Sequence, residues 1–265
     1  QLNLDSFGVD TLGLSKGNVG ILGALLVVGV GVGSVLAGWL SKGKVELGIV
    51  PLGVAGIVIS AVFLFATGRA VDPTLPVTEQ VSFYLACASL LVLGLSAGMF
   101  DIPLEANIQH RSAPEHLGTI LAATNIITFS CILGASGLFY VMTVTLGLGA
   151  DWVFLVMGVA TIPGIYFSFR ILPQQTIRFV VWMGSLFFYR LRVIGQDKIP
   201  EHGGAVLVAN HVSWLDGILL IMVSDRPIRM VAYSDYVDVP GFAGWLCRTF
   251  GTISIKSDGG PKALI

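Results

Sequence analysis

The stretch VGILGALLVVGVGVGSVLAGWL, residues 19–40, contains no charged side chain. As a helix it would rise about 33 Å, enough to cross the hydrocarbon core of a bilayer, which is about 30 Å thick. Similar apolar runs follow at residues 47–67, 82–104, 118–146 and 152–171. The sequence therefore predicts a membrane all-α part with five transmembrane helices, covering residues 1–172.

The composition supports a lipid environment for most of the chain. Of its 265 residues, 54% are hydrophobic and 12% are charged, and the mean hydropathy is +0.84. Soluble domains contain about twice that share of charged residues. The chain shows no basic cluster, which argues against a nucleic-acid partner. The three cysteines lack the spacing of metal ligands, so we expect no metal site and read them as small buried apolar side chains.

Glycines recur four residues apart within the apolar runs. They include Gly94 and Gly98, and we extend the same interpretation to Gly29, Gly31, Gly33 and Gly38 in the first run and to Gly134 and Gly137 in the fourth. In lipid, small residues at this spacing allow helices to approach one another closely. We therefore expect these glycines to lie where helices pack together.

Positive charges indicate which loops face the cytoplasm. Lys42 and Lys44 lie in the loop after the first run, Arg111 lies in the loop after the third, and more Arg and Lys residues follow Arg170. The alternate loops contain few positive charges, so the charged loops should be cytoplasmic by the positive-inside rule. We expect a multi-pass protein of a bacterial inner membrane with a cytoplasmic tail.

The chain after the fifth run predicts two further parts. Residues 176–189 are apolar but too short to span, and within a linker at 173–190 they suit a helix lying along the cytoplasmic leaflet. Residues 191–265 read as a soluble α/β domain. We expect strands at 191–194, 205–209, 229–233 and 252–255, and helices at 213–223 and 242–250. So little of the domain is present that we expect it to be truncated, in a fragment cut at both ends.

The stretch Asn210–Gly217, NHVSWLDG, holds the candidate chemistry. His211 follows a predicted buried strand, and Ser213 suits the N-cap of the next helix, with Asp216 in the acidic position of a capping box. Asp216 can then accept a hydrogen bond from one imidazole nitrogen of His211, which leaves the other as a general base. The positive end of the helix would favour a phosphate or an oxyanion. A bland alternative is an Asp cap beside a structural histidine.

This region resembles the glycerolipid acyltransferase family. The resemblance rests on Val193-Ile194-Gly195, Ile199-Pro200, Gly204 and, above all, residues 208–217. It implies that His211 deprotonates the free glycerol hydroxyl of a lysophospholipid, which then attacks an acyl thioester, while Asp216 orients His211. It also places Asn210 and Ser213 at the substrate site. The acyl donor would be acyl carrier protein or coenzyme A carrying the acyl group, with no bound cofactor.

The second motif of that family aligns with residues 251–257, GTISIKS. Gly251 occupies the glycine position, but the family's phosphate-binding Arg falls on Ser257, with Lys256 beside it. This departure favours the branch that reacylates lysophosphatidylethanolamine over a lysophosphatidic-acid enzyme. Lys256 is either a phosphate contact or a solvated side chain at the end of a strand. The third and fourth motifs should lie beyond residue 265, so we expect this fragment to be inactive.

The membrane part resembles major facilitator transporters, and lysophospholipid transporters in particular. The resemblance rests on the loop signature at residues 33–46 and on residues 101–109 and 118–125. It implies the last five of twelve helices of a major facilitator bundle, fused to the acyltransferase. Polar residues within the spans are candidates for a transport path because charge in hydrocarbon is costly. They are Asp101, Glu105 and Asn125, with Asn107; Glu105 and Asn107 could instead mark a solvated helix end.

Three functional hypotheses remain open from the sequence. The first couples lysophospholipid transport to reacylation in phospholipid remodelling, with membrane phospholipids and lysophospholipids, and acyl carrier protein, as partners. The second is an acyltransferase of 1-acylglycerol-3-phosphate with a helical membrane anchor. The third is a transporter with a regulatory tail.

Overall fold

The computed structural model describes residues 2–72, 74–188, 192–200, 202–213, 215–224 and 226–256. The chain divides into two compact units, Gln1–Ile171 and Leu172–Ile265, which are described separately.

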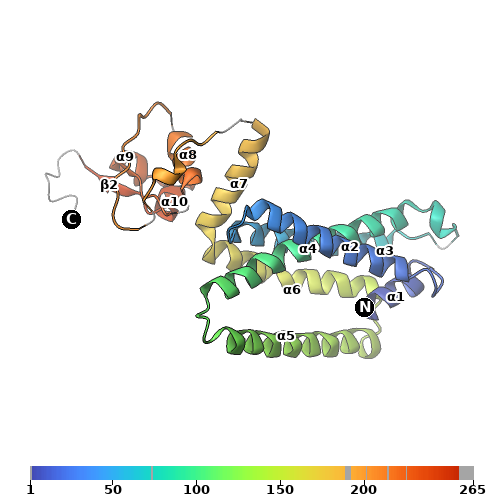
Figure 1. The fold of residues 1–265 in the computed structure, drawn as a ribbon. Helices are drawn as coiled ribbons and strands as arrows, with labels where there is room; N and C mark the ends of the chain where they lie inside the picture. Colours follow the sequence, from blue (N-terminus) through green and yellow to red (C-terminus); the bar gives the residue numbers. More distant parts are fainter. Residues whose placement is uncertain are drawn as a thin grey trace. The chain divides into compact units, whose positions relative to one another are not determined.

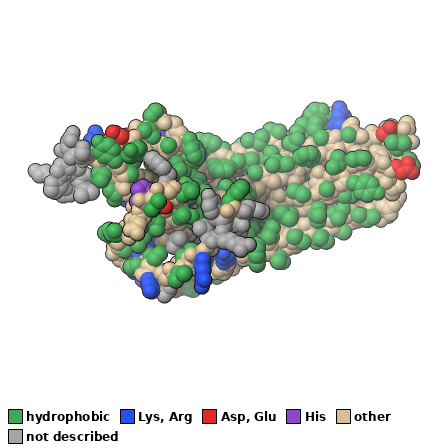
Figure 2. Space-filling view, turned by 90° about the horizontal axis from the view of Figure 1, so that it is seen from above, with side chains coloured by type: hydrophobic (Ala, Val, Ile, Leu, Met, Phe, Trp, Pro, Cys, Tyr) green, Lys and Arg blue, Asp and Glu red, His purple; other side chains and the backbone are tan. Residues whose placement is uncertain are grey.

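The first unit contains five helices that are long and apolar enough to cross a membrane. They are α2 (Gly20–Ser41), α3 (Val50–Arg69), α4 (Val81–Arg111), α5 (Leu117–Tyr140) and α6 (Ala150–Ile171) (Figure 1). Each predicted apolar run is confirmed as a helix. Hydrophobic side chains are spread over the visible side of this unit, and charged side chains are sparse along its length (Figure 2). The chain is thus compatible with a membrane protein.

Helix α4 is longer than the sequence predicts. We expected a loop from residue 105, but the helix continues through Pro103 and ends at Arg111. Helices in lipid tolerate a proline because neighbouring groups can satisfy the freed carbonyl. Glu105 and Asn107 therefore lie within the helix, and the loop before α5 is confined to residues 112–116.

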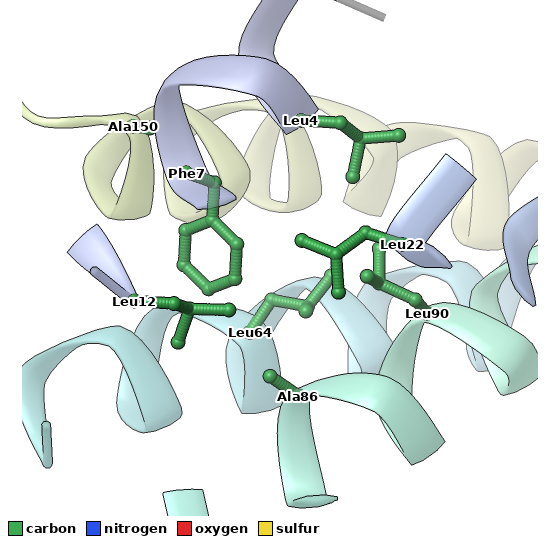
Figure 3. Packing of buried hydrophobic residues seen from close by; sticks show 8 residues of the cluster. All are labelled: Leu4, Phe7, Leu12, Leu22, Leu64, Ala86, Leu90 and Ala150. Carbon is green, nitrogen blue, oxygen red and sulfur yellow. The ribbon is translucent and has the colours of Figure 1, made fainter. Parts of the chain in front are cut away.

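A short N-terminal segment completes the core of the first unit. It comprises α1 (Leu2–Ser6) and the π-helical turn η1 (Phe7–Thr11), which the sequence analysis did not predict. Its side chains Leu4, Phe7 and Leu12 are buried against residues from α2, α3, α4 and α6 (Figure 3). The Phe7 ring meets Phe154 of α6 edge-on, with centroids 5.2 Å apart.

The prediction for the glycines is confirmed in part: Gly29, Gly33, Gly94 and Gly98 lie where α2 and α4 pack. It is wrong for Gly31, Gly38, Gly134 and Gly137, where an added methyl group would meet no neighbour within 4 Å. A methyl group added to Gly29 would lie 3.1 Å from the α-carbon of Gly94, and one added to Gly94 would lie 3.1 Å from the α-carbon of Gly29. One added to Gly98 would lie 2.7 Å from the backbone nitrogen of Ser34. The two backbones are therefore in direct contact, as the spacing predicts.

Helix α5 differs from the other long helices because none of its side chains is buried. It stands apart from α2, α3 and α4 in Figure 1. Large apolar side chains such as Ile126, Phe129 and Leu133 are exposed on it. Cys131 is exposed too, contrary to our expectation of buried cysteines, because its helix lacks a neighbour on that side.

The second unit combines helices with a two-stranded parallel sheet. Its elements are α7 (Pro173–Phe188), α8 (Leu215–Val223), β1 (Val231–Tyr233), α9 (Ser234–Val237), α10 (Phe242–Thr249) and β2 (Ile253–Ile255). Val231 pairs with Ile253 and Tyr233 with Ile255. The predicted strands at 229–233 and 252–255 and the predicted helices at 213–223 and 242–250 are confirmed with slightly shorter bounds, and the helix predicted at 176–189 begins earlier, at Pro173.

Two predicted strands are wrong for the described residues. Residues 192–194 and 205–209 have no regular secondary structure, and Leu191 lies outside the described residues. Val206 and Val208 are 89% and 93% exposed, where a buried strand was expected. A strand forms only when a neighbour accepts and donates its backbone hydrogen bonds. The described sheet consists of β1 and β2 and offers these segments no partner.

Candidate active site

The start of α8 is held by a reciprocal cap. The hydroxyl of Ser213 accepts a hydrogen bond from the backbone N–H of Leu215 at 3.3 Å. In return, Oδ2 of Asp216 accepts hydrogen bonds from the N–H groups of Val212 at 2.6 Å and Ser213 at 2.8 Å. This is the capping arrangement that the spacing of Ser213 and Asp216 predicts.

His211 meets the same carboxylate. Its Nδ1 lies 3.2 Å from Oδ2 of Asp216, so one oxygen receives three donors. The His211 side chain is 77% exposed and that of Asp216 is 27% exposed. With Nδ1–H donated to the carboxylate, Nε2 of the imidazole is left to accept a proton from a substrate.

The cap also controls the charge of Asp216. The backbone N–H groups of Ser213 and Val212 lower the pKa of this carboxyl from its ordinary value of 3.8, and His211 contributes a smaller part in the same direction. Hydrogen bonds to the ionised form stabilise it. Asp216 is therefore an anion at neutral pH, as a base-orienting residue must be.

The helix start is less available to a ligand than the sequence suggests. The N–H groups of Val212 and Ser213 donate to Asp216, that of Leu215 donates to the Ser213 hydroxyl, and that of Asp216 donates to the Ser213 carbonyl. All the N–H groups described at this helix start thus have acceptors within the chain. An oxyanion in the reaction would need other donors.

The remaining predicted substrate residues are Asn210, Gly251 and Lys256, and only Asn210 is adjacent in sequence to the His211–Asp216 pair. Asn210 is exposed in the irregular segment before His211. Gly251 has a φ of 63° and follows α10, while Lys256 is exposed directly after β2. Within the described residues, no hydrogen bond or ion pair joins Gly251 or Lys256 to His211. Ser257 lies outside the described residues.

Two contacts near the site carry no clear sequence signal. Arg226 donates from Nη1 to the carbonyl of Pro200 and from Nη2 to that of Gly203, each at 2.5 Å, and so holds the turn that precedes the His211 segment. Met230 packs on α8, because a methyl group on Gly217 would lie 2.6 Å from its sulfur. The only sequence signal for the Arg226 contact is that Pro200 and Gly203 indicate a turn, whose carbonyl groups need hydrogen-bond donors.

The transport candidates occupy different surroundings. Asp101 is exposed on α4, Glu105 is half-buried on the same helix, and Asn125 is exposed on α5. Within the described residues, no hydrogen bond or ion pair joins any two of them.

A charged pair that the sequence did not predict lies where α3 ends and α6 begins. Asp151 is buried at the start of α6, and its Oδ2 lies 3.8 Å from Nη1 of Arg69. The Arg69 guanidinium lies 5.8 Å from the centre of the Trp152 ring. Arg69 and Asp151 lie 82 positions apart in the sequence, so only the fold brings them together.

Comparison with known proteins identifies the second unit. Residues 190–263 match the family model described as Acyltransferase. No curated protein and no solved structure matches the chain. The chain therefore carries an acyltransferase domain, and the His211–Asp216 pair lies within it. This match supports acyl transfer in lipid metabolism as the chemistry of the domain.

Proposed function

We propose that the protein reacylates lysophospholipids at the cytoplasmic face of a bacterial inner membrane. The acyltransferase domain would transfer an acyl group from a thioester to the free glycerol hydroxyl. The observation that carries this proposal is the 3.2 Å contact between His211 Nδ1 and Asp216 Oδ2 inside the region that matches the family. The apolar helices argue for a substrate that resides in lipid.

The reaction follows from the protonation states of the pair. Nε2 of His211 takes the proton of the glycerol hydroxyl as its oxygen attacks the thioester carbonyl. The tetrahedral intermediate then collapses, the carbon–sulfur bond breaks, and the imidazolium returns the proton to the departing thiolate. Asp216 stabilises the imidazolium and fixes its orientation throughout. The products are the diacyl phospholipid and the free thiol of the donor.

The head group and the donor belong to the same proposal. Lys256 is the cation that follows β2, where the second motif of the family aligns, and we assign it to the acceptor's phosphate. A zwitterionic lysophosphatidylethanolamine suits a single exposed Lys better than a dianionic phosphomonoester does. The donor would be an acyl group on acyl carrier protein or coenzyme A.

We further propose that the helical unit moves lysophospholipid toward the enzyme. Asp101 and Asn125 expose polar groups on helices that are mostly apolar, and such groups are stable in a membrane only beside protein, water or a polar ligand. Helix α7, with Thr176 and Phe179 buried and Val180 exposed, has the two-sided character of an interfacial helix.

Acyl transfer and lipid uptake are measured separately in the full-length protein, reconstituted in vesicles. We expect His211→Ala to lose acyl transfer from both thioester donors to labelled lysophosphatidylethanolamine and to retain inward movement of the lipid. His202→Ala is the matched control, because His202 is an exposed histidine of the same unit. Transfer that persists in His211→Ala would refute the enzyme assignment. Absence of uptake in the wild type would leave a helical anchor instead of a transporter.

A further inference from the structure

Helix α10 presents an exposed stripe of two aromatic residues and one cation. Phe242 is 74% exposed and Trp245 is 43% exposed, and their ring centroids lie 5.6 Å apart. Arg248, one turn further on, is exposed as well. Gly244 is buried against the carbonyl of Val239, and a methyl group there would also lie 3.2 Å from Nη1 of Arg248, so the Arg248 guanidinium reaches back toward this packed side. The helix is therefore packed on one side and apolar on the other.

The chain tethers this helix close to a membrane span. The side chain of Gln174 donates a hydrogen bond from Nε2 to the carbonyl of Thr249, at the end of α10, at 2.6 Å. Gln174 lies three residues after Ile171, where α6 ends, so their α-carbons are at most about 11 Å apart. Trp245 precedes Thr249 by about one turn, or roughly 6 Å. With roughly 10 Å for the Gln174 side chain and its hydrogen bond, Trp245 lies at most about 27 Å from the end of α6, and Phe242, where α10 begins, at most about 32 Å.

The side chains of this stripe favour a membrane surface as the partner that covers it. Trp and other aromatic side chains are enriched at the boundary between lipid and water, and an adjacent Arg can place its charge among phosphates while its stem covers apolar surface. Two neighbouring aromatic side chains this exposed to water are unfavourable, and the boundary of a bilayer supplies the apolar depth that they need, with phosphates within reach of the long Arg248 side chain.

We propose that Phe242 and Trp245 of α10 insert into the cytoplasmic interface of the same membrane that α6 spans. This contact would hold the acyltransferase domain against the bilayer, at the level of the glycerol backbone of its lipid substrate. The proposal rests on the membrane-spanning character of α6 and not on the proposed reaction. It gives α10 a role distinct from that of the His211–Asp216 pair.

A nitroxide label tests the depth directly. The three cysteines are replaced by Ala, and a single Cys is placed at Phe242, at Trp245 or, as a matched control, at Asp235, an exposed carboxylate on α9. The full chain is reconstituted in vesicles of phosphatidylethanolamine and phosphatidylglycerol. Collision of the label with oxygen, which partitions into lipid, is compared with collision with a water-soluble nickel chelate.

We expect an oxygen-to-nickel ratio at 242 and 245 several-fold above that at 235. A ratio at both positions equal to that at 235 would overturn the proposal, because the stripe would then face water. Labels at 242 and 245 that neither reagent reaches would overturn it as well, since protein would cover the stripe. No acyl donor is present, so the result is independent of whether His211→Ala abolishes transfer.

Discussion

Replacing Gly33 with Ala would place a methyl group inside the backbone of α4. The added carbon would lie 2.7 Å from the carbonyl carbon of Leu95 and 2.8 Å from its α-carbon, and it would overlap the carbonyl oxygen. Backbone atoms cannot rotate aside as a long side chain can, so α2 must move away from α4. The movement would separate contacts along the whole of the α2–α4 pair.

Gly31 provides a matched control on the same helix. A methyl group at this position meets no atom within 4 Å. In a helix, Ala is favoured over Gly by up to about 1 kcal/mol. Gly31→Ala should therefore leave the first unit as stable as before, or stabilise it by up to about 1 kcal/mol.

The difference in stability between Gly33→Ala and Gly31→Ala follows from helix propensity and overpacking. Both gain the same helix propensity, so it cancels in the comparison. Overpacking of a well-packed site costs about 1–3 kcal/mol, and only Gly33→Ala incurs it. For a unit of about this size, 1 kcal/mol corresponds to about 2–4 °C in Tm, so we expect Gly33→Ala to melt about 2–12 °C below Gly31→Ala.

Cysteine reactivity can measure this difference in detergent. Cys87 packs against the buried core and becomes accessible to a thiol-reactive fluorophore when the helices separate. Cys131 and Cys247 are first replaced by Ser so that a single thiol reports. Equal midpoints for the two variants would refute the close contact between α2 and α4.

Three further predictions concern charged residues. Asp216→Asn should lower acyl transfer about 10²- to 10⁴-fold, because a neutral amide no longer orients and stabilises the imidazolium of His211. Folding lowers the pKa of Asp216, so the stability that this carboxylate confers is present above pH 3.8 and is lost as the pH falls through the folded pKa. The difference in stability between Asp216→Asn and the wild type should therefore shrink in acid. Arg226→Ala should destabilise the second unit by about 1 kcal/mol in chemical denaturation, as two exposed hydrogen bonds are lost. Arg69→Ala should lower the Tm of the first unit more than Asp151→Asn does, because Arg69→Ala leaves the buried carboxylate of Asp151 without its cation, whereas Asp151→Asn removes that carboxylate's charge. A larger loss of Tm in Asp151→Asn would exclude a stabilising ion pair.

The membrane helices could be predicted from the sequence because the requirement is local. In lipid, each backbone group must find its partner within the same helix, so about 20 apolar residues suffice to specify a span. The spacing predicted that Gly29 and Gly94 would each lie at a helix contact, but not that they would meet one another, and it predicted the same for Gly31 and Gly134, which meet no neighbour within 4 Å. The burial of Phe7 was not predictable, since it depends on a pocket formed by several helices.

The strands show the opposite case. The valines at 206 and 208 have the composition of a strand, yet a strand requires a second strand at the right distance, and composition says nothing about its presence. The sequence predicted the two strands that contain Val231 and Ile253, but not that these strands pair with each other. Arg226 escaped prediction because its two carbonyl partners lie more than 20 positions earlier in the chain.

The candidate catalytic pair could be predicted because it is built from the cap of a helix. A single oxygen of Asp216 accepts from two backbone N–H groups and from His211, so the interaction that starts α8 also positions the imidazole. The spacing that encodes the cap therefore also encodes the contact between His211 and Asp216 on which the proposed mechanism depends. A consequence is that Ser213→Ala, which removes only the hydroxyl half of the cap, should disturb catalysis far less than Asp216→Asn. The carboxylate performs both functions, and the hydroxyl performs one.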